Sequence, residues 1–325
     1  MAYYADVGTG FYPTGSDTSL EVGCLRGGCF SWGAYASRYT VPVGIEVAVF
    51  LLRVLWKRKI VSILKRALIK IAGNNLVQKL LDRNVLYSQH LMGIGSGSGV
   101  HCSGEVAIVR VLQQRSRPPY CIFDVGANKG QFLQMLLKHL VTGDVEVHCF
   151  EPGYETFKIL AGSVGEGDRI TLNNIGLGKE PCEAILYYDK AGSGIASLTK
   201  RNLDHLNIDF SQSEPVKIDT IDRYCSDRSI KHIHLLKIDV EGHEFDVLTG
   251  AQSMIESGSV DMVTFEFGGC NIDTRTFFRD FYYLFCETGY KILRITPSGY
   301  LSSIASYKEI DEQFRTTNFI AMLDR

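Results

Sequence analysis

Short apolar runs alternate with segments of helical periodicity along most of the chain. Residues 145–150 and 233–239 show the apolar runs most clearly, and residues 131–138 repeat apolar side chains at helical spacing. Strands that alternate with helices in this way build a mostly parallel sheet with helices on both faces. The pattern therefore predicts a doubly wound α/β domain from about residue 86 to the end. Strands are expected at 121–124, 145–150, 170–175, 183–188, 195–198, 216–221, 233–239, 260–267, 290–296 and 318–323. Helices are expected at 74–92, 104–114, 131–138, 154–163, 240–256 and 274–288.

The first strand of this domain ends in a glycine turn, Asp124 to Gly130 (DVGANKG), and the next strand ends on Glu151. Ligands of open parallel sheets bind beyond the carboxyl ends of the strands, so these features predict a nucleoside-type ligand. A dinucleotide site needs G-x-G-x-x-G for its pyrophosphate, whereas this turn has only Gly126 and Gly130, with Asn128 between them. Asp124 would oppose a phosphate but suit an ammonium group. S-adenosylmethionine, which has an amino-acid end and a ribose but no phosphate, therefore fits better than NAD.

Each residue of this first site has an expected role. Gly126 and Gly130 let the backbone pass close to the methionine portion, and Asp124 places negative charge near its amino group, directly or through water. Glu151 accepts hydrogen bonds from both ribose hydroxyls. Asn174 lies at the end of the third strand and is expected near the adenine, with simple turn formation as the alternative. The predicted cofactor-binding residues are Asp124, Gly126, Asn128, Gly130, Glu151 and Asn174.

A second acidic strand end supplies candidates for the chemistry. Methyl transfer from a sulfonium to an alcohol is an in-line displacement that a general base assists. The titratable candidates at the ends of the strands at 233–239 and 260–267 are Asp239, Glu241, His243, Glu244 and Glu266. Helix capping by Asp239 or Glu241 and a structural hydrogen bond from His243 remain alternatives. The cluster could hold a divalent ion, but its spacing does not demand one, and no metal is predicted. The predicted catalytic residues are Asp239, His243 and Glu266.

Together these motifs resemble the FkbM family of S-adenosylmethionine-dependent methyltransferases. The resemblance covers roughly residues 88–325 and includes a specific signature, Lys237 to Glu244 (KIDVEGHE). It implies a class I methyltransferase (Rossmann-like) sheet of seven strands with the last one antiparallel. It also implies methyl transfer to oxygen, with sugar or polyketide hydroxyls as typical acceptors. The other segments that carry the resemblance are residues 124–130 and 150–152, Val247 with Leu248, Gly250 with Ala251, and Phe265 with Glu266.

The N-terminal part lies outside this resemblance. Residues 1–43 are rich in Gly, Ser, Thr and Tyr and are expected to be disordered, residues 44–85 form a basic amphipathic helical extension, and residues 86–325 form the methyltransferase domain. The segment 45–72 either packs on the main domain or makes a peripheral contact with an anionic membrane surface. The glycine-rich run at 93–99 is either a linker or part of the binding site.

Composition bears on the ligands, the metal content and the location of the protein. The formal net charge of -2 gives no drive toward nucleic acid. Nine cysteines lack paired CxxC or Cys/His spacing, so neither a zinc site nor a disulfide framework is predicted. Their odd number favours a reducing compartment, and we expect a cytoplasmic protein, located at the inner face of the membrane if the basic segment binds lipid.

The leading hypothesis is an S-adenosylmethionine-dependent O-methyltransferase that acts on a small-molecule or glycan acceptor, namely a hydroxyl of a carbohydrate or related secondary metabolite. One alternative is a NAD-dependent oxidoreductase of Rossmann type, which the missing third glycine disfavours. The other is a non-catalytic cofactor-binding protein. The presence of both Asp124 and Glu151 argues against loss of the cofactor-binding pocket, although it does not establish turnover.

Overall fold

The structure, a computed structural model, describes residues 62–63, 65–97, 99, 103–141, 143–164 and 169–324. The predicted disordered segment 1–43 and most of the basic segment 45–72 lie outside the described residues. The chain divides into two compact units after Ile71. Of the first unit, residues 62–63 and 65–71 are described as helical. The second unit begins at Ala72 and contains the predicted α/β domain.

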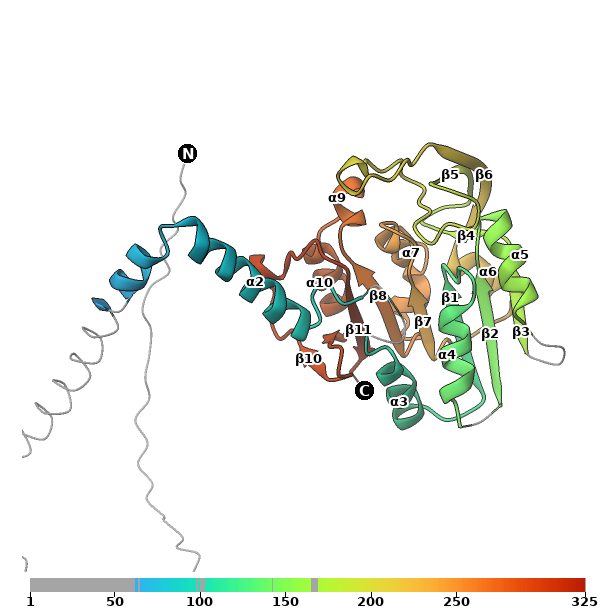
Figure 1. Ribbon diagram of the computed structural model, residues 1–325. Helices are drawn as coiled ribbons and strands as arrows, with labels where there is room; N and C mark the ends of the chain where they lie inside the picture. Colours follow the sequence, from blue (N-terminus) through green and yellow to red (C-terminus); the bar gives the residue numbers. More distant parts are fainter. Residues whose placement is uncertain are drawn as a thin grey trace, which may run out of the picture. The chain divides into compact units, whose positions relative to one another are not determined.

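The second unit is built on a sheet that has eight strands among the described residues, in the order β10-β9-β11-β8-β7-β1-β2-β3 (Figure 1). The strands from β8 to β3 in this order run parallel to one another, and β11 is antiparallel to both its neighbours. The predicted seven-stranded sheet with an antiparallel last strand is confirmed, and the short β10 extends its edge. The strands are β1 (Tyr120–Val125), β2 (Val145–Phe150), β3 (Ile170–Asn173), β7 (Leu235–Ile238), β8 (Met262–Phe267), β9 (Tyr290–Ile295), β10 (Leu301–Ser303) and β11 (Thr317–Leu323).

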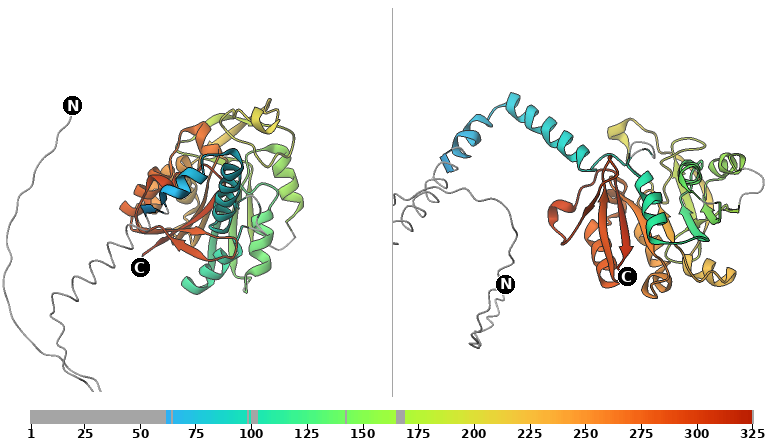
Figure 2. Two further views of the ribbon diagram at one scale, coloured as in Figure 1. Left: turned by 60° about the vertical axis from the view of Figure 1, so that its left-hand side comes forward. Right: turned by 90° about the horizontal axis from the view of Figure 1, so that it is seen from below.

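Helices cover both faces of this sheet (Figures 1 and 2). One face packs against α3, α4 and α5 and the other against α6, α7, α8 and α10. Neighbouring residues of β1 alternate between these layers, with Ile122 buried in the first and Phe123 in the second, as the two-residue period of a strand requires. The helices are α2 (Asn75–Leu91), α3 (Val106–Arg115), α4 (Gln131–His139), α5 (Tyr154–Gly162), α6 (Ile221–Arg228), α7 (Glu244–Thr249), α8 (Gln252–Glu256), α9 (Cys270–Thr274) and α10 (Phe278–Glu287), with short 3-10 turns at Asp204–Leu206 and Glu309–Asp311.

A second, three-stranded sheet supports the binding end of the domain. Its order is β4-β6-β5, formed by Gly176–Leu177, Gln212–Asp219 and Cys182–Tyr188. Leu186, Val216 and Ile218 form its small apolar core. Two of the three, Leu186 and Ile218, also line a cavity at the carboxyl end of the main sheet. The small sheet therefore supplies an apolar wall to the site.

The prediction of one helix over 240–256 is wrong in part. The observed helical segment starts at Glu244 and divides into α7 and α8. Glu241 and Gly242 have φ angles of 57° and 106°, which a right-handed helix does not allow. The Glu244 carboxylate accepts hydrogen bonds from the backbone N–H groups of Val240 and Gly242, and this fixes the loop before the helix. At the division, a Cβ on Gly250 would lie 2.0 Å from the Gly178 carbonyl oxygen.

Other elements also differ from the predictions. The expected strand at 195–198 is a single β-bridge between Tyr187 and Ser197. The helix expected at 274–288 begins at Phe278, because α9 ends at Thr274 and the next residue, Arg275, is left-handed with φ 57°. Finally, α6 was not predicted, although Thr220 caps its first turn by accepting a hydrogen bond from the Arg223 N–H group at 3.2 Å.

Candidate functional site

Two adjoining cavities lie at the carboxyl ends of the central strands. Their volumes are about 810 Å³ and about 70 Å³. Five residues line both cavities, namely Gly126, Asn128, Gly194, Asp239 and Glu241. Gly97 and Gly99 line the larger cavity, so the glycine-rich run at 93–99 contributes to this site. The location agrees with the crevice in which open α/β sheets bind their ligands.

The turn after β1 needs glycine because two backbone segments meet there. Gly126 has φ 76°, and a Cβ at this position would lie 1.8 Å from the Asp239 carbonyl oxygen. The N–H groups of Gly126 and Ala127 both donate to the Phe150 carbonyl oxygen at 3.0 Å, which ties the turn to the end of β2. Gly130 has φ 86° and precedes α4, but it lines neither cavity. Gly126 therefore forms the floor of the site, whereas Gly130 shapes the start of the helix.

Glu151 stands at the end of β2 on the wall of the smaller cavity. Its carboxylate accepts hydrogen bonds from the backbone N–H groups of Asn128 at 3.0 Å and Gly153 at 2.9 Å. Burial raises the pKa of Glu151 to about 7, although both N–H groups oppose the shift. Apolar side chains, including Phe150 and Leu177, line the same cavity. A carboxylate beside an apolar wall suits a ligand with a hydroxylated part and a flat, weakly polar part.

Asp124 does not face the cavities as the sequence suggested. Its side chain is completely buried and lines neither cavity. Lys237 Nζ lies 3.1 Å from Asp124 Oδ1 and donates a hydrogen bond to the Gly126 carbonyl oxygen, also at 3.1 Å. Burial raises the pKa of Asp124, with Lys237 opposing the rise. This ion pair lies beneath the turn and holds Gly126 in place.

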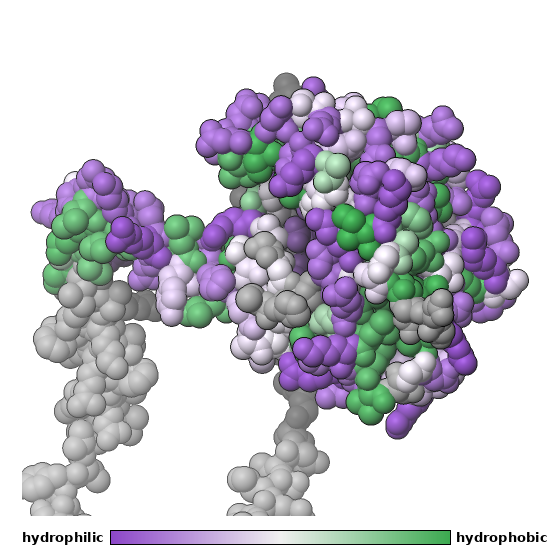
Figure 3. Space-filling model, turned by 45° about the vertical axis from the view of Figure 1, so that its right-hand side comes forward, coloured by the Kyte–Doolittle hydropathy of each residue, from purple (hydrophilic) through white to green (hydrophobic). Residues whose placement is uncertain are grey.

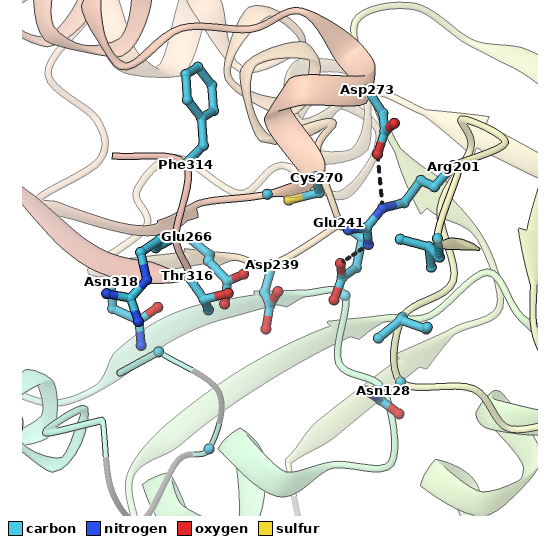
Figure 4. Close-up of a pocket in the computed structure, with 18 of the residues that line it drawn as sticks. Asn128, Arg201, Asp239, Glu241, Glu266, Cys270, Asp273, Phe314, Thr316 and Asn318 are labelled. Carbon is cyan, nitrogen blue, oxygen red and sulfur yellow. Dashed lines mark hydrogen bonds and ion pairs between the residues drawn. The ribbon is translucent and has the colours of Figure 1, made fainter. Parts of the chain in front are cut away.

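Five carboxylates line the larger cavity, and two of them, Asp239 and Glu266, were predicted to be catalytic (Figure 4). Asp239 is the most exposed of them, with 41% of its side chain accessible, and its Oδ2 lies 3.5 Å from Lys237 Nζ. Glu266 also lines this cavity, and burial, together with the charges of Asp239 and Glu241, raises its pKa well above the usual range. The environment therefore favours the protonated form of Glu266, while Asp239 has a cation beside it.

Glu241 belongs to a half-buried network that sequence reasoning missed. Arg201 donates hydrogen bonds to Glu241 Oε2 at 2.9 Å and to Asp273 Oδ2 at 3.2 Å (Figure 4). Burial and the nearby Asp239 raise the pKa of Glu241 to about 8, with Arg201 opposing the shift. All three network residues line the larger cavity. They come from the loop between β5 and β6, the loop after β7, and α9, so no local sequence signal could have joined them.

His243 is placed beside the site but is occupied by protein partners. Its Nδ1 lies 2.7 Å from Asp246 Oδ2, and its Nε2 lies 2.9 Å from Thr199 Oγ1. It lines only the smaller cavity. Since both ring nitrogens are hydrogen-bonded, the imidazole links α7 to the loop at Thr199.

Asn174 is not brought to the cavities. Its side-chain amide donates to the carbonyl oxygens of Glu151 at 2.9 Å and Pro152 at 3.0 Å, and it lines neither cavity. This geometry is the turn-forming alternative raised from the sequence. Of the segment after β3, Gly176 and Leu177 line the smaller cavity instead.

A histidine cluster lies elsewhere, before β7 and β8. It brings together His232, His234 and Asp261, with His232 Nε2 3.1 Å from Asp261 Oδ2. His234 Nδ1 accepts a hydrogen bond from the Cys121 backbone N–H group at 3.0 Å. A neutral imidazole that accepts at Nδ1 carries its proton on Nε2, so His234 offers no free lone pair to an ion. We assign no metal to this cluster.

The fold and the site define a class I methyltransferase. The sheet order with its antiparallel β11 is that of this class, and the cavities lie at the carboxyl ends of its strands. The chain belongs to the FkbM family, since it matches the Methyltransferase FkbM domain over residues 124–292, more than half of its length. Its cofactor is S-adenosylmethionine. The family and the cofactor predicted from the sequence are confirmed.

Several known proteins are similar to this chain. The 2-O-methyltransferase NoeI of Sinorhizobium fredii is 23% identical over 160 residues, which are 45% of this chain and 63% of that protein. The FkbM methyltransferase of Methylobacillus flagellatus has a structure with TM-score 0.38 and 16% identity, covering 77% of this chain and 60% of that one. An S-adenosylmethionine-dependent O-methyltransferase of Thermotoga maritima gives TM-score 0.34 and 13% identity, covering 67% and 64%. The chain thus spans slightly less than two thirds of each of these relatives.

Proposed function

We propose that this protein transfers the methyl group of S-adenosylmethionine to a hydroxyl oxygen of a carbohydrate or related secondary metabolite. The observation that carries the proposal is the position of Asp239, which lines both the smaller cavity beside Glu151 and the larger polar cavity. A carboxylate at this junction can accept the proton of a hydroxyl that lies where the methyl group is delivered. The name of the relative NoeI, a 2-O-methyltransferase, supports oxygen as the acceptor atom.

The residues of the smaller cavity fit the nucleoside part of the cofactor. Asn128 Oδ1 is buried and has no hydrogen-bond partner among the described residues, so it can accept a bond from a ligand. We assign the ribose hydroxyls to Glu151 and the adenine to the apolar wall that includes Leu177 and Ile218. Gly126 allows the methionine portion to approach the backbone. Asp124, Gly130 and Asn174 are assigned positioning roles, since none of them lines a cavity.

The bound cofactor supplies an electrophilic methyl carbon and a sulfur leaving group. We assign to Asp239 the role of general base, which accepts the proton of the acceptor hydroxyl. The oxygen–carbon bond then forms as the carbon–sulfur bond breaks, and the bonding electrons leave on sulfur. Glu266, whose pKa is raised by burial, donates a hydrogen bond to the acceptor in its protonated form. His243 is assigned a structural role, because both its ring nitrogens are occupied.

The larger cavity suits a hydroxylated acceptor. Its volume of about 810 Å³ is in the upper part of the range for small-molecule sites. Carboxylates, the Arg201 guanidinium and the Asn318 amide on its walls can donate and accept the many hydrogen bonds that a sugar offers. The oxidoreductase alternative has no such support, because the turn lacks the third glycine that a pyrophosphate needs.

The affinity for S-adenosylmethionine should depend on pH through Glu151. The pKa of this group is about 7 in the ligand-free protein because of burial, and only its ionised form accepts two hydrogen bonds from a diol. Binding should therefore weaken as pH falls through 7, by about tenfold between about pH 8 and pH 6. Calorimetric titration at both values measures this directly. Equal affinity at both values would show that the Glu151 carboxylate does not hold the ribose.

The acceptor chemistry is tested by incubating the full chain with methyl-deuterated S-adenosylmethionine and an extract of oligosaccharides and small metabolites. The proposal expects deuterated methyl groups on hydroxyl oxygens, located by mass spectrometry and NMR of the products. Label found on nitrogen or carbon instead would contradict the proposal. Tight cofactor binding without transfer to any component would favour the non-catalytic alternative.

A further inference from the structure

The helix α2 presents an apolar face that the described protein does not cover. At 100° per residue, most apolar side chains of α2 fall on one half of the helix, which also carries Asn84 and Ser88. The other half is polar except for Leu86. No residue of α2 is buried, and the exposed fractions of Leu76, Leu80 and Leu91 are 71%, 56% and 57%. Figure 3 shows exposed apolar side chains in green beside polar ones in purple on the helical segment. The outward face, as we name the apolar half, includes Leu76, Leu80, Leu81, Val85, Tyr87 and Leu91.

The helix is attached to the catalytic part by its polar side. Gln89, which lies outside the outward face, donates to Gln313 Oε1 at 2.9 Å and accepts from Arg315 NH1 at 2.7 Å. Just beyond the helix, Arg294 Nε donates to the Met92 carbonyl oxygen at 2.8 Å. Hydrogen bonds therefore hold the end of α2, and the leucines do not serve to pack it. An apolar half-helix left outside a domain indicates a binding surface.

The distribution of charge favours an anionic occupant. Residues 44–92 contain nine Lys or Arg and two Asp or Glu, whereas residues 93–325 contain 23 and 31. Lys79 and Arg83 of α2 lie on the polar half, next to the outward face. A second copy of the chain would bring the same cations against this helix in a symmetric contact, which like-charge repulsion disfavours. A lipid surface with anionic headgroups offers both an apolar layer and negative charge.

We propose that the outward face of α2 docks on the surface of an anionic lipid bilayer. Leu76, Leu80 and Leu91 enter the boundary between headgroups and acyl chains, while Lys79 and Arg83 pair with lipid headgroups. None of the helices in the described part of the chain has the length and hydropathy to cross a bilayer, and the helix lies along the surface. The charge of the preceding residues adds a second membrane signal, as stable surface binding requires.

Membrane docking has a consequence for the catalytic site. Arg315, which holds Gln89 of α2, lines the larger cavity, as do Gly97 and Gly99 just after the helix. A bilayer-bound α2 therefore holds this wall of the acceptor cavity near the lipid. The inference itself stands on α2 and does not depend on the proposed methyl transfer.

Vesicle co-sedimentation of the full chain tests the proposal. Phosphatidylcholine vesicles with and without phosphatidylserine are compared at low and high salt. Wild-type protein should bind only the vesicles that contain phosphatidylserine, and less well at high salt. The triple variant Leu76→Gln, Leu80→Gln and Leu91→Gln should lower the partition coefficient at least about tenfold, since three leucines no longer enter the apolar layer. Glutamine keeps a helix propensity close to that of leucine, so α2 is preserved.

A matched control removes the same number of exposed apolar side chains elsewhere. The variant Val141→Gln, Tyr300→Gln and Ile310→Gln, at positions that are 91%, 67% and 72% exposed, should bind like wild type. Equal binding by the α2 variant and wild type would overturn the proposal, as would wild-type protein that binds neither vesicle. A wild-type dimer that the α2 variant converts to monomers, without vesicle binding, would assign the face to a second copy and also overturn it.

Discussion

Replacing Asp239 by asparagine should lower kcat by about 10²- to 10⁴-fold, the range in which a positioned general base contributes. Asp239 lines both cavities and, unlike Glu241, is not bound to Arg201. The amide of the variant has nearly the same size but cannot accept the proton. The affinity for S-adenosylhomocysteine should change by less than about tenfold, because Glu151 and the turn at Gly126 remain. Single-turnover kinetics with calorimetry of the product complex separates the two effects.

The matched control for this change is Asp246→Asn. Asp246 lies seven residues further on and pairs with His243, but it lines neither cavity. The Asp246→Asn variant should keep kcat within about threefold of wild type, as expected for a change outside the reacting groups. If Asp239→Asn turned over as fast as this control, the general base would have to be another group, and Glu266 would be the next candidate.

Replacing Lys237 by methionine should lower the free energy of unfolding by about 3–5 kcal/mol, the cost of breaking a buried ion pair from one side. The side chain is buried, and burial lowers its pKa, but Asp124, Asp239 and Glu105 outweigh that effect and raise the pKa. The variant leaves Asp124 completely buried without its cation. Urea unfolding of both proteins measures the difference.

The double variant Asp124→Asn and Lys237→Met should recover most of this loss, because the completely buried residue 124 then carries no charge. The loss in the single variant should also shrink at low pH. Burial raises the pKa of folded Asp124 above its unfolded value of 3.8 and Lys237 opposes this rise, so removal of Lys237 should raise the pKa further. In the variant the unfolded state releases this proton first, and unfolding becomes more favourable as pH rises above about 4. A single variant that is destabilised by less than about 1 kcal/mol at neutral pH would show that the pair contributes little.

Much of the fold follows from local patterns in the sequence. The run at Val145–Phe150 was predicted with its observed bounds, because a buried parallel strand is continuously apolar. Errors arose where tertiary contacts overrode the pattern. The helix after β7 divides at Gly250, whose backbone lies against Gly178, a residue more than seventy positions earlier. Its second half, α8, is capped by the Asp222 carboxylate, which accepts from the N–H groups of Ser253 and Met254.

The site was predictable where one strand end carries the chemistry. Glu151 and Asp239 stand at strand ends and line the cavities. Asp124 also stands at a strand end, but its side chain is buried against Lys237. The lysine inside the apolar strand β7 was the available sequence sign of that partner. Arg201 and Asp273 carried no such sign, since their contact joins a loop and a helix that are 72 residues apart.

Calorimetric titration of the full chain with S-adenosylmethionine, and separately with NAD, tests the central claim most directly. The wild-type protein should bind S-adenosylmethionine and not NAD. Glu151→Ala should lose about 10²-fold in affinity for S-adenosylmethionine, the equivalent of one to two hydrogen bonds to a charged group. Glu155→Ala, an exposed acid on the following helix, should bind like wild type. Binding of NAD without S-adenosylmethionine, or unchanged affinity of Glu151→Ala, would contradict the assignment of this cavity to the methyl donor.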